Sequence, residues 1–161
     1  MKEIIQRLRN RLIESGKGQI RPASGADLKR AIDAGFPGEL IEFYREYEPD
    51  PQKQCIKLRQ RIWCINSAIE ENKEAVPGVS LFPRGYVVFA SNNRGDSYCL
   101  DTNVSSPDGH HPVVLFPHDA FDESAPLSEI LEFRLEVASS IKDFLEKFAE
   151  GTLTEKPNNL G

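Results

Sequence analysis

The clearest pattern in the chain is a set of three short apolar runs near its middle, separated by turn residues. The runs are Tyr86–Ala90, Tyr98–Leu100 and Val113–Phe116, and they are rich in β-branched and aromatic residues. Residues 92–95 read Asn-Asn-Arg-Gly, and residues 105–109 read Ser-Ser-Pro-Asp-Gly. Because Gly and Asn adopt positive φ at little cost, both breaks predict turns. The pattern therefore predicts an antiparallel meander of three strands.

Apolar residues at helical spacing dominate the first fifty residues. Residues 1–15 predict an amphipathic helix that two glycines just beyond it are expected to stop. Ser24 predicts the N-cap of a second helix, with Asp27 reaching back to the cap and Leu28, Ala31 and Ile32 as its apolar stripe. Pro37 predicts the first turn of a third helix. The third helix is expected to bury Leu40, Ile41, Phe43, Tyr44 and Tyr47 and to point Glu39, Glu42, Glu46 and Glu48 away from the core.

Further elements are predicted on both sides of the meander. Residues 55–65 form a strand region with imperfect alternation. Ser67 with Glu70 predicts a capping box that opens a short helix, which Pro77 closes. After the meander, apolar and charged residues alternate over 131–137, and this period of two predicts a strand with one buried face.

The C-terminal part of the sequence predicts one more helix and then a tail. Ser140 with Asp143 predicts the cap of this helix, and Gly151 its end. No repeat or linker interrupts the chain, so residues 1–151 are expected to form a single domain of mixed helices and antiparallel sheet. Residues 152–161 are expected to be a frayed C-terminal tail.

The totals fit an ordinary globular domain. The chain has 161 residues, of which 39% are hydrophobic and 28% charged, and this length suffices for one buried core. No apolar run approaches the roughly 18 residues that a membrane-spanning helix needs. Three arginines interrupt the apolar residues of the N-terminus, which excludes a secretory signal there. A cytoplasmic protein without membrane contact is expected.

The charge is distributed unevenly along the chain. The formal net charge is −5, yet the first thirty residues are basic. Acidic residues concentrate in two later stretches: Glu39, Glu42, Glu46, Glu48 and Asp50, and then Asp119, Asp122, Glu123, Glu129, Glu132 and Glu136. Acidic surfaces repel nucleic acid and attract basic partners, although a solvated surface without a partner is the simpler alternative. An acidic third helix also argues against a DNA-reading helix-turn-helix.

The three histidines of the chain are candidate metal ligands. His110 and His111 are adjacent, and neighbouring residues of an extended segment point in opposite directions, so a shared ion is not expected. His118 with Asp119 remains the better candidate for half of a metal site. The sequence as a whole predicts neither a metal nor a cofactor.

Catalytic alternatives are also weaker than structural ones. Cys55, Cys64 and Cys99 are an odd number of cysteines without a C-x-x-C pair, and they are expected to be reduced, buried thiols. Cys99 lies in a predicted strand and lacks a nucleophile signature. Asp96 and Asp101 are an alternative acid–base pair for glycoside cleavage, but a turn and a strand end explain them as well. The protein is therefore not expected to be an enzyme.

The order of these features resembles the SUKH superfamily, which includes the Smi/Knr-type regulators of cell-wall synthesis and bacterial toxin-immunity proteins. Four stretches carry the resemblance over about residues 20–150: Ala26–Tyr44 with its Phe-Pro junction, where Phe36 replaces the usual Leu, Ile62–Asn72, Gly85–Asp101 followed by Pro112–Val114, and Ser139–Leu145. Each stretch alone is generic capping and core chemistry. The ordered set is what is similar to the family.

The resemblance implies an α+β fold in which a curved antiparallel sheet is flanked by the N-terminal helices and one C-terminal helix. It implies a non-catalytic immunity protein that binds and neutralises a toxin, often a nuclease. A scaffold or signalling adaptor of the cell-wall-regulator type is the alternative. Contact with the partner is expected at the acidic residues and at the turn after the first meander strand: Glu42, Glu46, Asn92, Asn93, Arg94, Asp96, Asp122 and Glu123.

Overall fold

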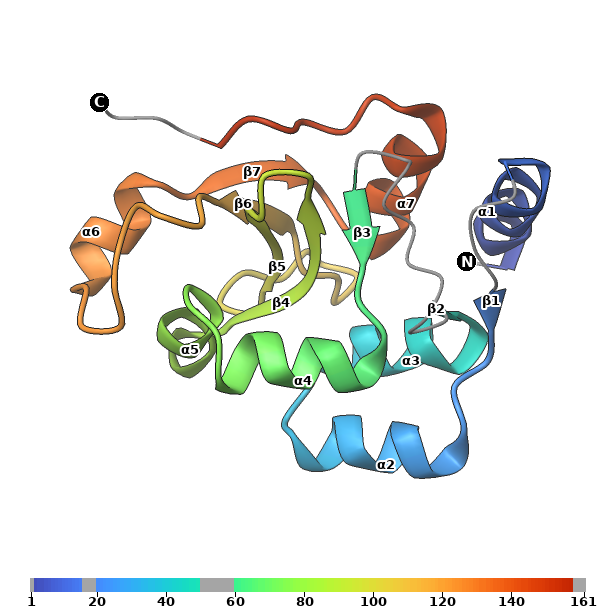
Figure 1. The fold of residues 1–161 in the computed structure, drawn as a ribbon, viewed down its shortest axis with the longest axis horizontal. Coiled ribbons are helices and arrows are strands. Elements are labelled where there is room, and N and C mark those ends of the chain that lie inside the picture. The colour runs from blue at the N-terminus through green and yellow to red at the C-terminus, as the bar shows by residue number, and fades with distance from the viewer. Residues whose placement is uncertain (1, 16–19, 50–59, 158–161) are drawn as a thin grey trace.

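The predicted meander forms the centre of a five-stranded antiparallel sheet in the computed structural model (Figure 1). The structure describes residues 2–15, 20–49 and 60–157. The strand order is β3-β4-β5-β6-β7, and every neighbouring pair is antiparallel. The strands are β3 Gln60–Ile62, β4 Tyr86–Asn92, β5 Ser97–Asp101, β6 Val113–Phe116 and β7 Leu135–Ala138.

Alternate side chains of the central strands enter two separate hydrophobic cores. On β4, Val87 and Phe89 belong to the larger core, whereas Tyr86 and Val88 belong to the smaller one. A β-bulge between Val88 and Ala90 shifts the register of β4 with β5. Because both faces of the sheet are covered, the sequences of these strands are continuously apolar and do not alternate with polar residues.

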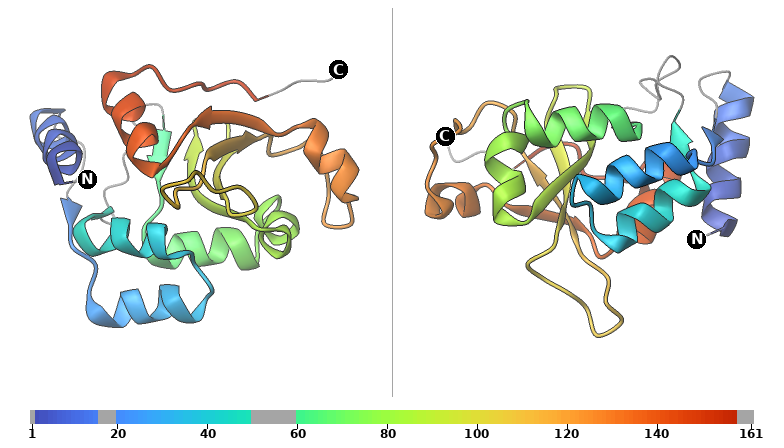
Figure 2. Two further views of the ribbon diagram at one scale, coloured as in Figure 1. Left: turned by 180° about the vertical axis from the view of Figure 1, so that it is seen from behind. Right: turned by 90° about the horizontal axis from the view of Figure 1, so that it is seen from below.

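Helices supply the cover on both faces (Figures 1 and 2). They are α1 Lys2–Ser15, α2 Gly25–Asp33, α3 Gly38–Glu46, α4 Ile65–Lys73, α5 Gly78–Leu81, α6 Leu127–Glu132 and α7 Ile141–Glu150, and the short 3-10 turn η2 Phe82–Arg84 leads into β4. Phe43 of α3 and Phe144 of α7 lie in the larger core, and Ile130 of α6 lies in the smaller one. A small second sheet pairs β1 Ile20–Arg21 with β2 Glu48–Pro49. The predicted α+β class, with an antiparallel sheet flanked by helices, is confirmed.

The C-terminal helix α7 matches its prediction closely. Ser140 Oγ accepts a hydrogen bond from the Asp143 backbone N–H at 3.0 Å, and Gly151 ends the helix with φ 74°. Phe144 lies edge-on to Tyr98 of β5, with ring centroids 5.2 Å apart. This helix therefore connects the larger core directly to the central strand of the sheet.

The predicted caps of α3 and α4 are wrong in detail. Pro37 is the N-cap of α3 rather than its first helical residue. Cys64 is the N-cap of α4, and Ser67 lies inside the first turn. Glu48, expected to point away from the core, is 2% exposed, and its Oε1 accepts from the Ile65 N–H at 3.3 Å. A distant carboxylate thus takes the place of a local cap, where the helix dipole favours negative charge.

Helix α2 follows its prediction at the cap but not along its apolar stripe. Ser24 Oγ accepts from the Asp27 N–H at 3.1 Å, as expected. The Asp27 carboxylate lies 3.7 Å from the Arg30 guanidinium instead of reaching back to the cap. Ile32, expected in the buried stripe, is 52% exposed.

The strand predicted over 131–137 is wrong in its first half. Residues up to Glu132 belong to α6, whose N-cap is Pro126, and only Leu135–Ala138 form a strand. The sequence alternates there because the end of a helix, with Leu131 exposed, directly precedes a short strand with a buried end. A period of two across the junction of two elements does not define one strand.

The first part of the expected frayed tail is attached to the sheet. Leu153 is buried in the larger core. Tyr98 Oη donates to the Thr154 carbonyl at 2.7 Å, and Asn92 Nδ2 donates to the Glu155 carbonyl at 2.8 Å. The predictions for the glycines after α1, for residues 55–59 with Cys55, and for the last four residues lie outside the described residues.

Candidate partner-binding surface

The eight expected contact residues divide among three separate parts of the fold. Glu42 and Glu46 lie on α3, Asn92 lies at the end of β4, residues 93–96 form the turn into β5, and Asp122 and Glu123 precede α6. Helices α3 and α6 lie far apart in every view of the molecule (Figures 1 and 2). The structure therefore does not bring the eight residues together in one surface.

Two residues of the β4–β5 turn are buried rather than exposed. Asn92 and Asp96 are 7% and 3% exposed. Asn92 Nδ2 donates to Asp96 Oδ2 at 2.8 Å, and Asn92 Oδ1 accepts from the backbone N–H groups of Arg94 and Asp96. These bonds close the turn from within, so that Asn93 and Arg94 at its tip are exposed.

Asp96 also connects this turn to the segment after β6. Its Oδ1 accepts from the His118 backbone N–H at 3.0 Å and lies 2.8 Å from His118 Nδ1. Burial raises the pKa of Asp96, but hydrogen bonds from Asn92 and His118 outweigh it and hold the pKa below its usual value. The carboxylate is therefore kept ionised as the acceptor at the centre of the turn.

His118 and Asp119, the predicted half of a metal site, follow β6, and His118 lies next to Asp96. His118 Nε2 lies 3.9 Å from Asp119 Oδ2 while its Nδ1 faces Asp96. Across residues 2–15, 20–49 and 60–157, no group of three or more His, Cys, Asp or Glu side chains is arranged to hold a metal ion. The arrangement suits an anchor for the turn.

The region around α6 combines exposed leucines with carboxylates. Leu127 and Leu131 are 46% and 47% exposed, and their spacing of four places them on one side of the helix. A shallow cavity beside the helix is lined by the loop 119–126 and by Glu129. We call the following residues the α6 surface: Asp119, Asp122, Glu123, Leu127, Glu129, Leu131 and Glu132.

A second cavity lies between β3, α4 and the β4–β5 turn. Arg61 and Trp63 line it from β3 and the segment after it, and Glu71 lines it from α4. Ser91, which faces Arg61 across the strand pair, lines it together with Asn92, Asn93 and Gly95. The Arg61 guanidinium lies over the Trp63 ring, 4.9 Å from its centroid.

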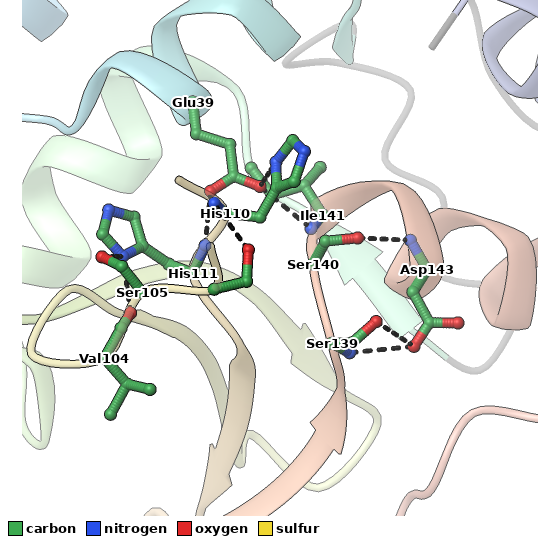
Figure 3. Close-up of polar contacts among 10 residues, drawn as sticks. Glu39, Val104, Ser105, His110, His111, Ser139, Ser140, Ile141 and Asp143 are labelled. Carbon is green, nitrogen blue, oxygen red and sulfur yellow. Dashed lines mark hydrogen bonds and ion pairs between the residues drawn. The ribbon is translucent and has the colours of Figure 1, made fainter. Parts of the chain in front are cut away.

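Glu39 connects three elements through its carboxylate (Figure 3). Its Oε2 accepts from the His111 backbone N–H at 2.9 Å, and its Oε1 accepts from the Ile141 N–H at 3.4 Å. His110 Nδ1 lies 3.4 Å from the same Oε1. The carboxylate thus holds the loop between β5 and β6, which projects from the sheet in Figure 2, against α3 and the start of α7. Glu39, expected to point away from the core, is a structural link.

The residues named as catalytic alternatives, Cys99, Asp96 and Asp101, also have structural surroundings. Cys99 lies in the middle of β5 with no exposed surface, and burial raises the pKa of its thiol well above the usual value. Asp96 and Asp101 lie at opposite ends of β5, and Asp101 pairs with Arg134 through bonds of 2.8 and 2.9 Å. The two carboxylates therefore serve different partners.

Three residues of the second cavity were missed in the sequence. Arg61 lies in β3 and Trp63 just after it, two positions apart in extended chain, which places both side chains on one face. Trp63 is also the only tryptophan of the chain. The pair could have indicated a binding site from the sequence, because Trp and Arg are enriched among the residues that contribute most to protein–protein binding. Glu71 comes from a different element, and its presence in the cavity follows only from how α4 packs on the sheet.

Most of the chain matches one known protein family. The family described as SMI1 / KNR4 family (SUKH-1) matches residues 22–147. The chain belongs to this family, and the resemblance seen in its sequence is confirmed. A comparison with curated proteins found no match. Family membership supports the immunity and Smi1-type class in general, and with it a protein as partner.

Among the residues that the structure describes, no helix combines the length and apolar character needed to cross a bilayer.

Proposed function

We propose that this protein is a non-catalytic immunity protein that binds a toxin and neutralises it by covering its active site. The observation that carries this proposal is the match to the SMI1/KNR4 family over most of the chain. The exposed carboxylates support a basic partner, as expected for a toxin that acts on nucleic acid. An intracellular site of action is part of the same proposal.

The α6 surface is the contact region that we favour. It joins exposed apolar side chains to a rim of negative charge, which is the usual anatomy of an interface core and its surroundings. Glu42 and Glu46 on α3, with the turn residues Asn93 and Arg94, are further contacts in this proposal. Asn92 and Asp96 are not contacts in this proposal, because their hydrogen bonds maintain the conformation of the turn.

The experiment is a binding and rescue test with the product of the gene adjacent to that of this protein. We expect that product to arrest growth when produced alone, and to copurify with this protein and lose its toxicity when both are produced together. Absence of both a complex and a rescue would contradict the proposal. A stable complex with a non-toxic protein would favour the scaffold or adaptor alternative instead.

A further inference from the structure

The cavity of about 320 Å³ beside Trp63 carries one positive and one negative side chain without an ion pair between them. The Arg61 guanidinium rests on the Trp63 ring, and among the described residues it forms no salt bridge. The Glu71 carboxylate likewise forms no hydrogen bond or salt bridge within that part of the chain. Burial raises the pKa of Glu71, and the nearby guanidinium of Arg61 opposes that rise only in part.

This pair of charges disfavours an ion of either sign. An anion in the cavity is attracted by Arg61 but repelled by Glu71. A cation is attracted by Glu71 but repelled by Arg61. A neutral group with a hydrogen-bond acceptor and a hydrogen-bond donor meets neither repulsion. The electrostatics therefore select for a polar group that carries no net charge.

The hydrogen-bonding groups of the cavity narrow the choice of neutral ligand further. The Trp63 indole N–H is buried and has no acceptor among the described residues, so it is not open to a ligand and Trp63 contributes only ring surface to the wall. Arg61 offers donors, and Glu71 is an acceptor. A ligand oxygen that accepts from Arg61 satisfies these donors without adding a charge. An amide presents such an oxygen together with an N–H for the carboxylate.

We propose that this cavity binds an amide group of a protein partner, either a main-chain peptide group or the side chain of Asn or Gln. The amide oxygen accepts from Arg61, the amide nitrogen donates to Glu71, and the Trp63 ring under Arg61 supplies an apolar wall. Asn93, exposed at the rim, adds a further polar contact. This inference rests on the proposed function only in taking a protein as the partner.

The single tryptophan gives a direct test that needs no partner protein. In ¹⁵N-labelled protein the Trp63 indole N–H gives one resonance, and it is followed while small probes are added. The probes are N-methylacetamide for the peptide group, propionamide for the side chain, and propionate and propylammonium as charged analogues. We expect saturable shifts with an amide, at a Kd at least about threefold lower than with either ion.

The tighter of the two amides identifies whether main chain or side chain is bound. No saturable shift with either amide, or tighter binding of an ion, would overturn the proposal. Because no toxin takes part, such a result leaves the proposed function untouched. A failed rescue in the toxin experiment likewise leaves this titration informative.

Two variants test the charge argument itself. Glu71→Gln leaves the cavity positive, so propionate should become the preferred probe, whereas Arg61→Met leaves it negative, so propylammonium should be preferred. Glu74→Gln, an exposed residue of the segment just after α4, is the matched control and should keep the preference for amides. Unchanged amide resonances of β4 and β5 establish that each variant is folded. Variants that all retain the wild-type preference would contradict the assignment of Arg61 and Glu71.

Discussion

At the scale of single residues, the buried polar side chains complete backbone hydrogen bonds that the regular elements leave open. Asn72 is the clearest case, because its Nδ2 donates to the Ala68 and Val88 carbonyls and its Oδ1 accepts from the Val88 N–H, each at 2.8 Å. It thereby joins α4 to β4 beside the bulge. Glu39 and Asp96 act in the same way elsewhere. Such residues are structural although they are polar.

Asn72→Ala should be strongly destabilising. The change leaves the N–H and C=O of Val88 without their side-chain partner in a site that is 1% exposed. We expect the free energy of unfolding in urea to fall by about 3 kcal/mol. Asn93→Ala, at the exposed tip of the turn, is the control and should change it by less than about 0.5 kcal/mol. Equal effects of the two changes would contradict this role for Asn72.

The stability contributed by Asp96 should depend on pH in the acid range. Its pKa is lower in the folded protein than in the unfolded chain, so the contribution is complete above the unfolded value of about 3.9. It is lost as the pH falls through the folded pKa. Urea unfolding between pH 7 and pH 2 measures this, and Asp96→Asn should flatten the loss below about pH 4. An unchanged slope in this variant, with exposed Asp108→Asn as control, would exclude Asp96 as its source.

At the scale of elements, α4 and α5 approach so closely that one position admits only glycine. A Cβ built at Gly78 would lie 1.7 Å from the Glu71 carbonyl oxygen of α4. The backbone of α4 cannot yield without moving Asn72, which is bonded to the sheet. The packing of these two helices on β4 therefore depends on a missing side chain.

Gly78→Ala should destabilise the protein by about 2–3 kcal/mol, because backbone atoms have to separate to admit the methyl group. Thermal or urea unfolding provides the measurement. Gly25→Ala at the start of α2 is the matched control, since no atom lies within 4 Å of the added Cβ. Alanine is also the better helix former, so this control should be neutral or slightly stabilising. A stable Gly78→Ala variant would show that α4 and α5 can move apart.

At the scale of the whole molecule, the apolar side chains are used in two cores, and the exterior carries the charge. The formal net charge is −5, and the loop before α6 with α6 itself holds the densest group of exposed carboxylates. Opposite charge on a partner would speed association, with an effect that declines as salt screens it. The α6 surface is therefore expected to govern how fast a basic partner is captured.

Reversing two charges of the α6 surface tests this expectation. Glu123→Lys with Glu132→Lys should slow association with the toxin by about tenfold at low salt and weaken the salt dependence of its rate. Stopped-flow or surface-based kinetics at several salt concentrations give the measurement. Asp108→Lys on the exposed loop between β5 and β6 is the control and should have a smaller effect. Equal rates in the reversed variant and in wild type would place the contact elsewhere.

Much of the fold was determined by local sequence. The runs at β4, β5 and β6 form strands because their apolar, β-branched and aromatic residues are buried on both faces, and the cap of α7 follows from Ser140 and Asp143, three positions apart. The predictions failed where a partner distant in sequence decided the outcome. Glu48 replaces a local cap for α4, and the segment after α7 is attached to Tyr98 and Asn92.

By itself, the sequence determined the α+β class and the order of the main elements, because these follow from periodicity, turn residues and caps that act over a few positions. The family was indicated by the resemblance of the ordered stretches and is shown by the family match. Only the tertiary structure decided which polar residues are buried and which surround a cavity. Trp63 and Glu71 line the same cavity because α4 packs on the edge of the sheet. Asp96, expected at an exposed turn, is buried because His118 lies against its carboxylate. Burial is a property of the whole packed chain, so no short window of sequence contains it.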